Sequence, residues 1–382
     1  MSSVNFLEKL LDGVAVNFLP LGDVTNYEQP TKYLVAAKNY SDDFDTPVLT
    51  AGKTFILGYT DESEGIYRAS EHPVIIFDDF TTANKWVDFD FKAKSSAMKM
   101  ITSKDNEKFL LKYIYYWLNT LPNELIDGDH KRQWIGNYSN KLIPIPCPDN
   151  PKKSLEIQAE IVRILDTMTA HTAELTAELT ARKKQYNYYR DKLLSFEDGE
   201  VEWKTLGEVT YINTGSKPEE ICDEATDFDY INAGTTRSGY SEESNCEGDT
   251  VTTPSRGQGG IGFVGYQKNP FWLGPLCYKI RSSDQNRLIN KYIYYYLQSN
   301  SKLIIELKKE GGVPAVNKSD LAKLNFPIPS ISKQKYIVST LDKFDALTAS
   351  ITEGLPREIE LRQKQYAYYR DLLLSFPQAQ TA

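Results

Sequence analysis

Residues 182–196 read RKKQYNYYRDKLLSF and residues 362–376 read RQKQYAYYRDLLLSF, so twelve of fifteen letters recur at an offset of 180. Two long blocks, residues 25–110 and 210–290, do not resemble each other. A scaffold that is repeated while these blocks differ indicates two recognition surfaces held in a fixed relation. Shorter echoes flank the main repeat, namely KYIYYWL from Lys112 and KYIYYYL from Lys291, PIP from Pro144 and Pro327, and LGDV from Leu21 and LGEV from Leu206.

The repeated segments have the period of long helices that pair along a heptad seam. The second seam has one extra step of four near Leu355, where Gly354 and Pro356 predict a kink or a short break. A single heptad seam would also fit a helix buried inside a domain core. Two such seams in one chain favour two helices that pair with each other in antiparallel orientation. The first seam runs through Ile161, Leu165, Met168, Thr172, Leu175, Leu179, Arg182, Tyr186, Tyr189 and Leu193, and the second through Ile337, Leu341, Phe344, Thr348, Ile351, Leu355, Ile359, Arg362, Tyr366, Tyr369 and Leu373.

Each unlike block is rich in short β-type runs cut by Gly, Asn, Asp and Ser, and each closes with an aromatic helix at residues 108–119 or 288–308. We expect these helices to pack on a sheet, and a base-stacking platform is the alternative. The predicted fold class is α+β, in two pseudo-repeated halves. Each half consists of a β-rich block with its packed aromatic helix, followed by a long coiled-coil helix.

The length of 382 residues predicts two globular domains, and the net charge of −8 argues against indiscriminate nucleic-acid binding. Any contact with DNA must therefore use segregated basic patches or charge supplied by a partner. We see no leader and no apolar run near twenty residues, which predicts a cytoplasmic chain without a membrane span. The cysteines and histidines show no metal-binding spacing and no catalytic triad, so we expect free thiols at Cys147, Cys222, Cys246 and Cys277 and no metal or nucleophile site built with His72, His130 or His171.

Two glycine motifs imitate nucleotide-binding loops. GIGFVG at residues 260–265 spells GxGxxG but precedes a β-type run instead of a helix, and AGKT at residues 51–54 lacks the first glycine of a phosphate loop. KNPFW at residues 268–272 resembles the tetrapeptide with which amino-methyltransferases hold a flipped base, but no cofactor loop accompanies it. We therefore predict that the chain carries out no chemistry itself.

The chain resembles the specificity subunits of Type I restriction–modification systems over essentially its whole length. The resemblance rests on the duplicated layout, the QYxYYRDxLLSF end of each long helix, EGLPREIELRQKQY at residues 353–366 and DGEVEWKTLGEV at residues 198–209. TAELTAELTA at residues 172–181 is similar to the tandem tetrapeptides of the IC branch. At the start of the first half, Asn17 and Phe18 stand where the second half has Glu202 and Trp203, which puts only local packing in doubt.

This resemblance implies a non-catalytic subunit without a cofactor of its own. In the family, each unlike block is a target recognition domain that reads one half of a bipartite, asymmetric site in double-stranded DNA, and the helices set the spacer. Two modification subunits, which carry S-adenosylmethionine, dock on the helices, and restriction subunits that use ATP and Mg join them. The implied domains are residues 1–150 and 198–330 for recognition and residues 151–197 and 331–382 for the spacer helices. The exposed faces of residues 182–192 and 362–372 are the docking candidates, with ordinary solvated helix as the alternative.

Base reading needs donors and acceptors on loops that can enter a groove. In the second block we favour PSRGQGG above all, because its glycines allow close backbone approach and its arginine can pair with guanine. For any one residue, plain surface solvation is the alternative. The first-block candidates are Lys53, Tyr59, Thr60, Thr81, Thr82, Lys85, Lys92, Lys94, Ser95, Ser96 and Lys99, and the second-block candidates are Lys217, Thr235, Thr236, Arg237, Ser255, Arg256 and Gln258.

Two other classes of protein remain open at this point. A DNA-free coiled-coil adaptor would also use long helices and two display domains, but it would not need Ser, Thr, Arg and Lys beside glycines. A self-sufficient DNA methyltransferase would need cofactor and catalytic signatures that we do not find in this sequence.

Overall fold

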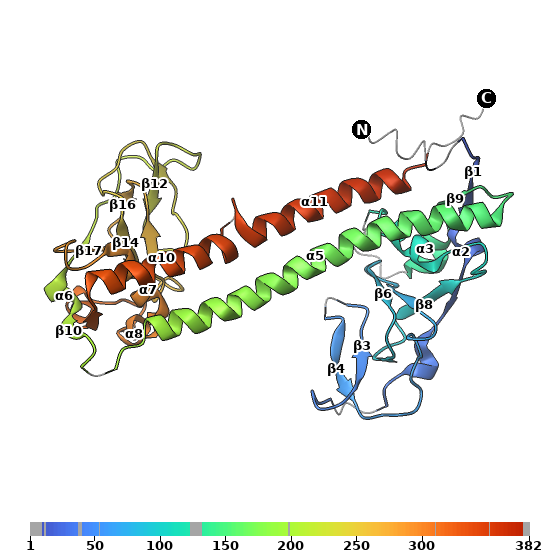
Figure 1. The fold of residues 1–382 in the computed structure, drawn as a ribbon, viewed down its shortest axis with the longest axis horizontal. Coiled ribbons are helices and arrows are strands. Elements are labelled where there is room, and N and C mark those ends of the chain that lie inside the picture. The colour runs from blue at the N-terminus through green and yellow to red at the C-terminus, as the bar shows by residue number, and fades with distance from the viewer. Residues whose placement is uncertain are drawn as a thin grey trace. The chain divides into compact units, whose positions relative to one another are not determined.

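The computed structural model describes residues 10, 13–36, 40–52, 54–122, 132–197, 199–309, 311–350 and 352–376. The chain divides into two compact units, the first made of residues 1–174 and 359–382 and the second of residues 175–358. Each unit therefore combines one of the two unlike blocks with segments from both regions of long helix (Figure 1). Both ends of the chain belong to the first unit.

The strands, with the aromatic and long helices that follow them, come in the same order in the two halves, while the short helices between them differ. The first half contains β1 (Val16–Pro20), α2 (Leu21–Val24), β2 (Thr25–Glu28), η1 (Pro30–Tyr33), β3 (Thr46–Leu49), β4 (Ile56–Thr60), β5 (Val74–Asp78), β6 (Asn84–Val87), β7 (Lys92–Ala93), β8 (Met98–Ser103), α3 (Leu111–Leu118), α4 (Gln133–Gly136), η2 (Tyr138–Asn140), β9 (Leu142–Pro146) and α5 (Pro151–Leu193). The second half contains β10 (Glu202–Thr205), α6 (Leu206–Val209), β11 (Thr210–Thr214), β12 (Phe228–Ile231), β13 (Tyr240–Ser241), β14 (Thr250–Pro254), β15 (Gly265–Gln267), β16 (Trp272–Leu273), β17 (Cys277–Ser282), α7 (Asn290–Ser299), α8 (Ser301–Glu306), α9 (Lys318–Leu321), β18 (Asn325–Ile328), α10 (Ile331–Thr348) and α11 (Gly354–Leu374).

The two unlike blocks share one sheet topology, a likeness that their sequences do not show. A four-stranded antiparallel sheet has the order β2-β8-β5-β6 in the first unit and β11-β17-β14-β15 in the second. A three-stranded sheet has the order β4-β3-β7 in the first and β13-β12-β16 in the second, with one antiparallel and one parallel pair in each. The duplication therefore extends through the blocks as well as the helices.

In the first unit, α3 packs on one face of the four-stranded sheet and the three-stranded sheet covers the other. The strand β5 is buried at all five positions, so its alternate side chains serve two cores. Ile75 and Phe77 pack with Tyr113 of α3, whereas Val74 and Ile76 pack with Leu49 of β3 and its neighbours. The second unit repeats this arrangement, with Val251 and Ile280 packed against α7 and with Leu273 and Cys277 in a separate cluster.

The aromatic helices are packed, as predicted, and do not form a base-stacking platform. Their recurring aromatic side chains are all buried, namely Tyr113, Tyr116 and Trp117 of α3 and Tyr292, Tyr295 and Tyr296 of α7. The Tyr113 hydroxyl donates to the Pro144 carbonyl at 2.6 Å, and the Tyr292 hydroxyl donates to the Pro327 carbonyl at 3.2 Å. Each PIP segment, which lies at the end of strand β9 or β18, is thus held to its own aromatic helix by the same bond.

A buried glutamine makes a second repeated brace in each unit. Gln158 of α5 accepts from the Leu110 N–H at 2.9 Å and donates to the Lys108 carbonyl at 2.9 Å. Gln334 of α10 accepts from the Ile289 N–H and donates to the Arg287 carbonyl, both at 2.9 Å. Both glutamine side chains are fully buried, so their polar groups depend on these bonds.

The helix α5 runs for 43 residues without a break (Figure 1). Pro151 begins it, and the Asn150 side chain accepts from the Lys153 N–H at 3.1 Å as an N-terminal cap. In the first unit, Leu165 of α5 shares a core with Leu373 of α11, while His171 faces the same groove as Arg362. Later residues of α5 thus meet earlier residues of α11, and the pair is antiparallel.

In the second unit, α5 pairs with α10 in the same sense. The rings of Tyr186 and Tyr189 lie 5.8 and 5.9 Å from that of Phe344, measured between centroids, while Leu194 shares a core with Ile337. The predicted break is also present, because α10 ends at Thr348 and α11 begins at Gly354. Gly354 has φ +75°, and a Cβ atom there would lie 2.2 Å from the Ala346 carbonyl oxygen, so only glycine fits.

Candidate nucleic-acid interface

The polar loops of the second unit meet at one end of its four-stranded sheet, beyond the last residue of β14. The Ser255 N–H donates to the Leu276 carbonyl at 2.9 Å, and the Leu276 N–H donates to the Asn232 side chain at 2.9 Å. The Gly215 N–H donates to the Gly274 carbonyl at 3.1 Å. These bonds join the loops that follow β11, β12 and β14 into one surface, which we call the second reading edge.

Two glycines allow the loop after β14 to lie directly on the loop after β12. A Cβ atom on Gly260 would stand 2.2 Å from the Ala233 carbonyl oxygen, so no side chain fits there. Gly257 has φ +124°, which L side chains rarely adopt. The structure therefore brings PSRGQGG and the TTR segment together, as neighbours that the sequence alone did not reveal.

The predicted residues of the second unit lie on this edge and most of them are exposed. Arg256 is exposed, and the structure shows no ion pair or hydrogen bond of its side chain within the described residues. Arg237 donates to Asp229 at 3.3 Å and lies 4.3 Å from the centroid of the Tyr240 ring. Ser255 is only 8% exposed, which leaves it a supporting role. The remaining candidates on this edge are exposed, namely Lys217, Thr235, Thr236 and Gln258.

Sequence reasoning missed one segment of the second reading edge. Lys309 and Ala315 exchange two backbone hydrogen bonds of 2.8 and 3.3 Å, and Ala315 in turn forms an antiparallel bridge with Arg256. The Val316 N–H also donates to the Ser255 carbonyl at 2.9 Å. The Gly-Gly-Val-Pro run at residues 311–314 was the available signal for a turn, but nothing local indicated which loop it would join.

The first unit has an equivalent edge beyond β5. The Asp79 N–H donates to the Ala97 carbonyl at 3.4 Å, so the turn after β5 lies beside the loop that precedes β8. The Lys94 ammonium donates to the Tyr40 hydroxyl at 2.9 Å. Lys53 lies outside the described residues. The exposed candidates on or beside this edge are Thr81, Lys85, Ser95 and Ser96.

Four first-unit candidates are buried, and we no longer propose them as DNA contacts. Lys92 is 4% exposed, and its ammonium lies 2.7 Å from a Glu62 carboxylate oxygen. Lys99 is 1% exposed, pairs with Asp79 at 3.5 Å and sits 5.0 Å from the centroid of the Tyr27 ring. Charged groups are buried when a partner compensates them, so these lysines support the loops from inside. The other two are Thr60 and Thr82, which are 1% and 2% exposed.

Tyr59 and Thr60 also lie at the wrong end of their sheet. They close β4, where Thr60 is the partner of Thr46 at the start of β3. The turn after β3 is therefore a full strand length away from them. The sequence identified the polar residues correctly but could not tell which end of a strand they would occupy.

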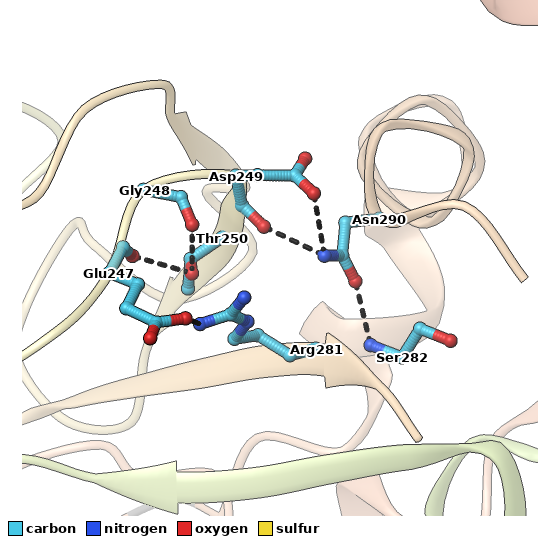
Figure 2. Close-up of polar contacts among 7 residues, drawn as sticks. All are labelled: Glu247, Gly248, Asp249, Thr250, Arg281, Ser282 and Asn290. Carbon is cyan, nitrogen blue, oxygen red and sulfur yellow. Dashed lines mark hydrogen bonds and ion pairs between the residues drawn. The ribbon is translucent and has the colours of Figure 1, made fainter. Parts of the chain in front are cut away.

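The opposite end of β14 is fixed to α7 by a network of internal bonds (Figure 2). The Asn290 amide donates to the carbonyl of Asp249 at 2.8 Å and to its carboxylate at 2.9 Å, and it accepts from the Ser282 N–H at 2.7 Å. Arg281 pairs with Glu247 at 2.6 Å. The side chains of Asn290 and Arg281 bond within the protein at this end, in contrast to the exposed Arg256 at the reading edge.

The junction of α7 with the long helices in the second unit contains two neighbouring carboxylates. The Tyr295 hydroxyl lies 2.5 Å from Asp342 and 2.7 Å from Asp345, and the Lys291 ammonium lies 2.8 Å from Asp342. Burial raises the pKa of Asp345 above its ordinary value, although hydrogen bonds from Tyr295 and Tyr186 oppose the rise. The hydroxyls of Tyr295 and Tyr186 and the ammonium of Lys291 thus hold the two carboxylates beside each other at this junction.

The repeated ends of the long helices present matched tyrosine pairs. Tyr188 and Tyr189 are 61% and 39% exposed, and Tyr368 and Tyr369 are 55% and 37% exposed. Their rings pack edge to face at 5.3 Å in the first pair and 5.4 Å in the second. The two faces thus offer the same chemistry in the same geometry.

The described residues hold no group of three or more His, Cys, Asp or Glu side chains placed to bind a metal ion. All four cysteines are free thiols. GIGFVG forms the connection between β14 and β15 and does not open a helix, so it lacks the context of a dinucleotide-binding loop. Among the described segments, we find no helix with the length and apolar character that a membrane span requires.

Comparison with protein families gives a match over both halves. The profile described as "Type I restriction modification DNA specificity domain" matches residues 14–183 and 199–361. The EcoR124I/EcoR124II specificity subunit of Escherichia coli, a type I restriction enzyme subunit, is 56% identical over 406 residues, which covers 100% of this chain and 99% of that one. The EcoprrI specificity subunit of E. coli is 32% identical and covers 92% of this chain and 93% of its own length.

Solved structures show the same fold. The S subunit of the type I restriction-modification system from M. genitalium superposes with a TM-score of 0.68 at 18% identity, covering 96% of this chain and 98% of that one. A chain solved in work on complex assembly of the type I R-M system gives a TM-score of 0.54 at 17% identity, over 94% of this chain and 97% of that one.

Proposed function

This chain belongs to the family of type I restriction–modification DNA specificity subunits, and on that premise we propose how its parts divide the work of reading DNA. The recognition domains, residues 1–150 and 198–330, each read one half of a bipartite, asymmetric site in double-stranded DNA. The contacts come from the two reading edges. The observation that carries this proposal is that one sheet topology occurs twice with unlike loops at the same end.

Direct readout at the second edge centres on Arg256. An exposed guanidinium without an internal partner can donate two hydrogen bonds to the acceptors of one guanine in the major groove. Gln258 has the matching chemistry for adenine, and Lys217 is placed to contact a phosphate. At the first edge, Thr81, Lys85, Ser95 and Ser96 supply the exposed donors and acceptors.

The spacer helices, residues 151–197 and 331–382, set the separation of the half-sites and dock two modification subunits. The matched tyrosine faces at residues 182–192 and 362–372 support two equivalent docking surfaces, because equal exposure and ring geometry let the same partner surface bind twice. From the TAEL tandem at residues 172–181 we infer, as part of this proposal, that the chain belongs to the IC branch.

The remaining parts of the system belong to its other subunits. The modification subunits hold S-adenosylmethionine and methylate adenine, and restriction subunits that use ATP and Mg join the complex afterwards. The assembly works in the cytoplasm, where its DNA and methyl donor are. This chain contributes recognition and no chemical step.

The test is DNA binding by the full chain co-purified with its modification subunits. The target sequence comes from methylation mapping of DNA in cells that carry the system. We expect the complex to bind that duplex more tightly than a scrambled one, with affinity falling steeply as salt rises. Equal binding of both duplexes would contradict the proposal, and absence of binding to either would favour a DNA-free adaptor.

A further inference from the structure

We propose that the Lys309 arm, defined by Lys309, Pro314, Ala315 and Val316, is a further part of the second DNA interface. In this proposal the Lys309 ammonium contacts a phosphate beside the base pair that Arg256 reads. The inference rests on the proposed function and adds to it a residue that sequence reasoning did not select.

Backbone pairing connects Lys309 to Arg256 through Ala315. Arg256 is bridged antiparallel to Ala315, and Ala315 is bridged antiparallel to Lys309. Residues directly opposite each other in antiparallel strands project their side chains to the same face. Arg256, Ala315 and Lys309, which are joined by these two single bridges, therefore have their side chains on the same face.

The spacing and the small central side chain of this row of three residues suit a DNA groove. Neighbouring strands lie about 4.8 Å apart, which puts the backbones of Arg256 and Lys309 roughly 10 Å apart. This separation is comparable with the width of the major groove, about 12 Å. The side chain between them is the methyl group of Ala315, which blocks neither cation. One cation can thus reach a base edge while the other reaches the groove wall.

The exposed Lys309 has an ion-pair partner that a phosphate can replace. Its ammonium lies 3.0 Å from an Asp320 carboxylate oxygen, and the Lys309 side chain is 61% exposed. The hydrogen bond from Lys309 lowers the pKa of Asp320, so the carboxylate is ionised and orients the lysine. An exposed ion pair of this kind contributes little stability. Exchanging the carboxylate for a DNA phosphate therefore costs little, and Asp320 keeps the ammonium at the edge until DNA arrives.

The test compares Lys309→Ala with a matched control in the full chain with its modification subunits. Binding to the mapped duplex and to single-base variants is measured between about 50 and 200 mM salt. Loss of one phosphate contact should lower the slope of log affinity against log salt by about 0.9 and weaken binding about fivefold to tenfold near 0.1 M salt. The ranking of base variants should not change, and Lys309→Arg should restore the slope.

The control is Lys268→Ala. Lys268 is exposed, and its carbonyl accepts from the Asp249 N–H at 3.3 Å, so it lies at the end of β14 opposite the second reading edge. This variant should keep the wild-type slope. An unchanged slope in Lys309→Ala, an equal loss in Lys268→Ala or an altered base ranking in Lys309→Ala would each overturn the inference. Failure of the wild-type complex to prefer its mapped duplex would instead overturn the proposed function.

Discussion

Replacing Gln334 with Met should loosen the second unit and leave the first intact. The Gln334 side chain is fully buried and makes three hydrogen bonds to backbone groups, of 2.9, 2.9 and 2.8 Å, with Ile289, Arg287 and Pro329. Methionine has nearly the same length and flexibility and fills the space without making these bonds. The substitution therefore isolates the loss of polar contacts from the loss of packing.

The magnitude follows from the number of bonds. Each contributes about 1 kcal/mol net, so the unit should lose about 3 kcal/mol, which is close to a hundredfold change in an opening equilibrium. Hydrogen exchange resolved by peptide measures this opening separately for each unit. Amides of α7 and β18 should lose about a hundredfold in protection, while those of α3 and β9 should keep theirs.

The chain supplies its own matched variant. Gln158→Met removes the two equivalent backbone bonds in the first unit, together with a bond to the Ser154 hydroxyl, and should produce the mirror-image pattern. DNA binding should change in the same unit-specific way. Gln334→Met should reduce discrimination between bases within one half-site, and Gln158→Met should reduce it within the other. Equal loss of protection in both units from either variant would refute the reasoning, as would a change below about 0.5 kcal/mol.

Four further predictions follow from the same structure. Arg256→Ala should cost about 1 to 3 kcal/mol for the cognate base in one half-site only, and changed preferences in both halves, measured with base-substituted duplexes, would sink the modular interpretation. Inserting one more TAEL after Leu179 lengthens the helix by about 6 Å and rotates everything beyond it by a net angle near 40°. One base pair of B-DNA advances about 3.4 Å and turns about 35°. Methylation mapping should therefore show a target site whose spacer is one base pair longer and whose half-sites are unchanged. Burial raises the pKa of Asp345 from 3.8, so between pH 3.8 and the raised pKa the folded state keeps a proton that the unfolded state loses. The stability that this group contributes is therefore fully present below pH 3.8 and falls as the pH rises through the raised pKa. Asp345→Asn should flatten that fall in urea titrations of the second unit at several pH values, and an unchanged fall would remove Asp345 as the cause. Leu10 packs against the cluster that holds Leu374, so a circular permutant opened after Phe196 should still assemble with modification subunits, and a permutant that co-purifies with none would argue against joined ends.

The parts of this protein that follow from local periodicity could be predicted from its sequence. Heptad seams and a repeat with twelve of fifteen letters identical indicated the long helices, and Gly354 with Pro356 indicated the break between α10 and α11. The aromatic helices were predicted as packed elements and are packed. Such features depend on residues only a few positions apart in the chain. The helix period and the backbone conformations that glycine and proline allow are enough to predict them.

The candidate interface was predicted less completely, because exposure depends on partners distant in the chain. Lys92 and Lys99 carry the positive charge that a DNA contact needs, yet their ion pairs with Glu62 and Asp79 hold them inside the first unit. Lys309 was not among the DNA contacts predicted from the sequence. Its bridge to Ala315, which is itself bridged to Arg256, places Lys309 in register with that residue 53 positions earlier.

The sequence by itself determined that there are two halves, two long helical regions and polar loops rich in glycine. Only the tertiary structure decided that the unlike blocks share one topology and that the polar loops meet at one end of each sheet. Strand pairing between distant segments fixes which end of a strand a loop occupies and which face a side chain takes. A shift of one residue in that register would turn every side chain over, and no local pattern in the sequence records it.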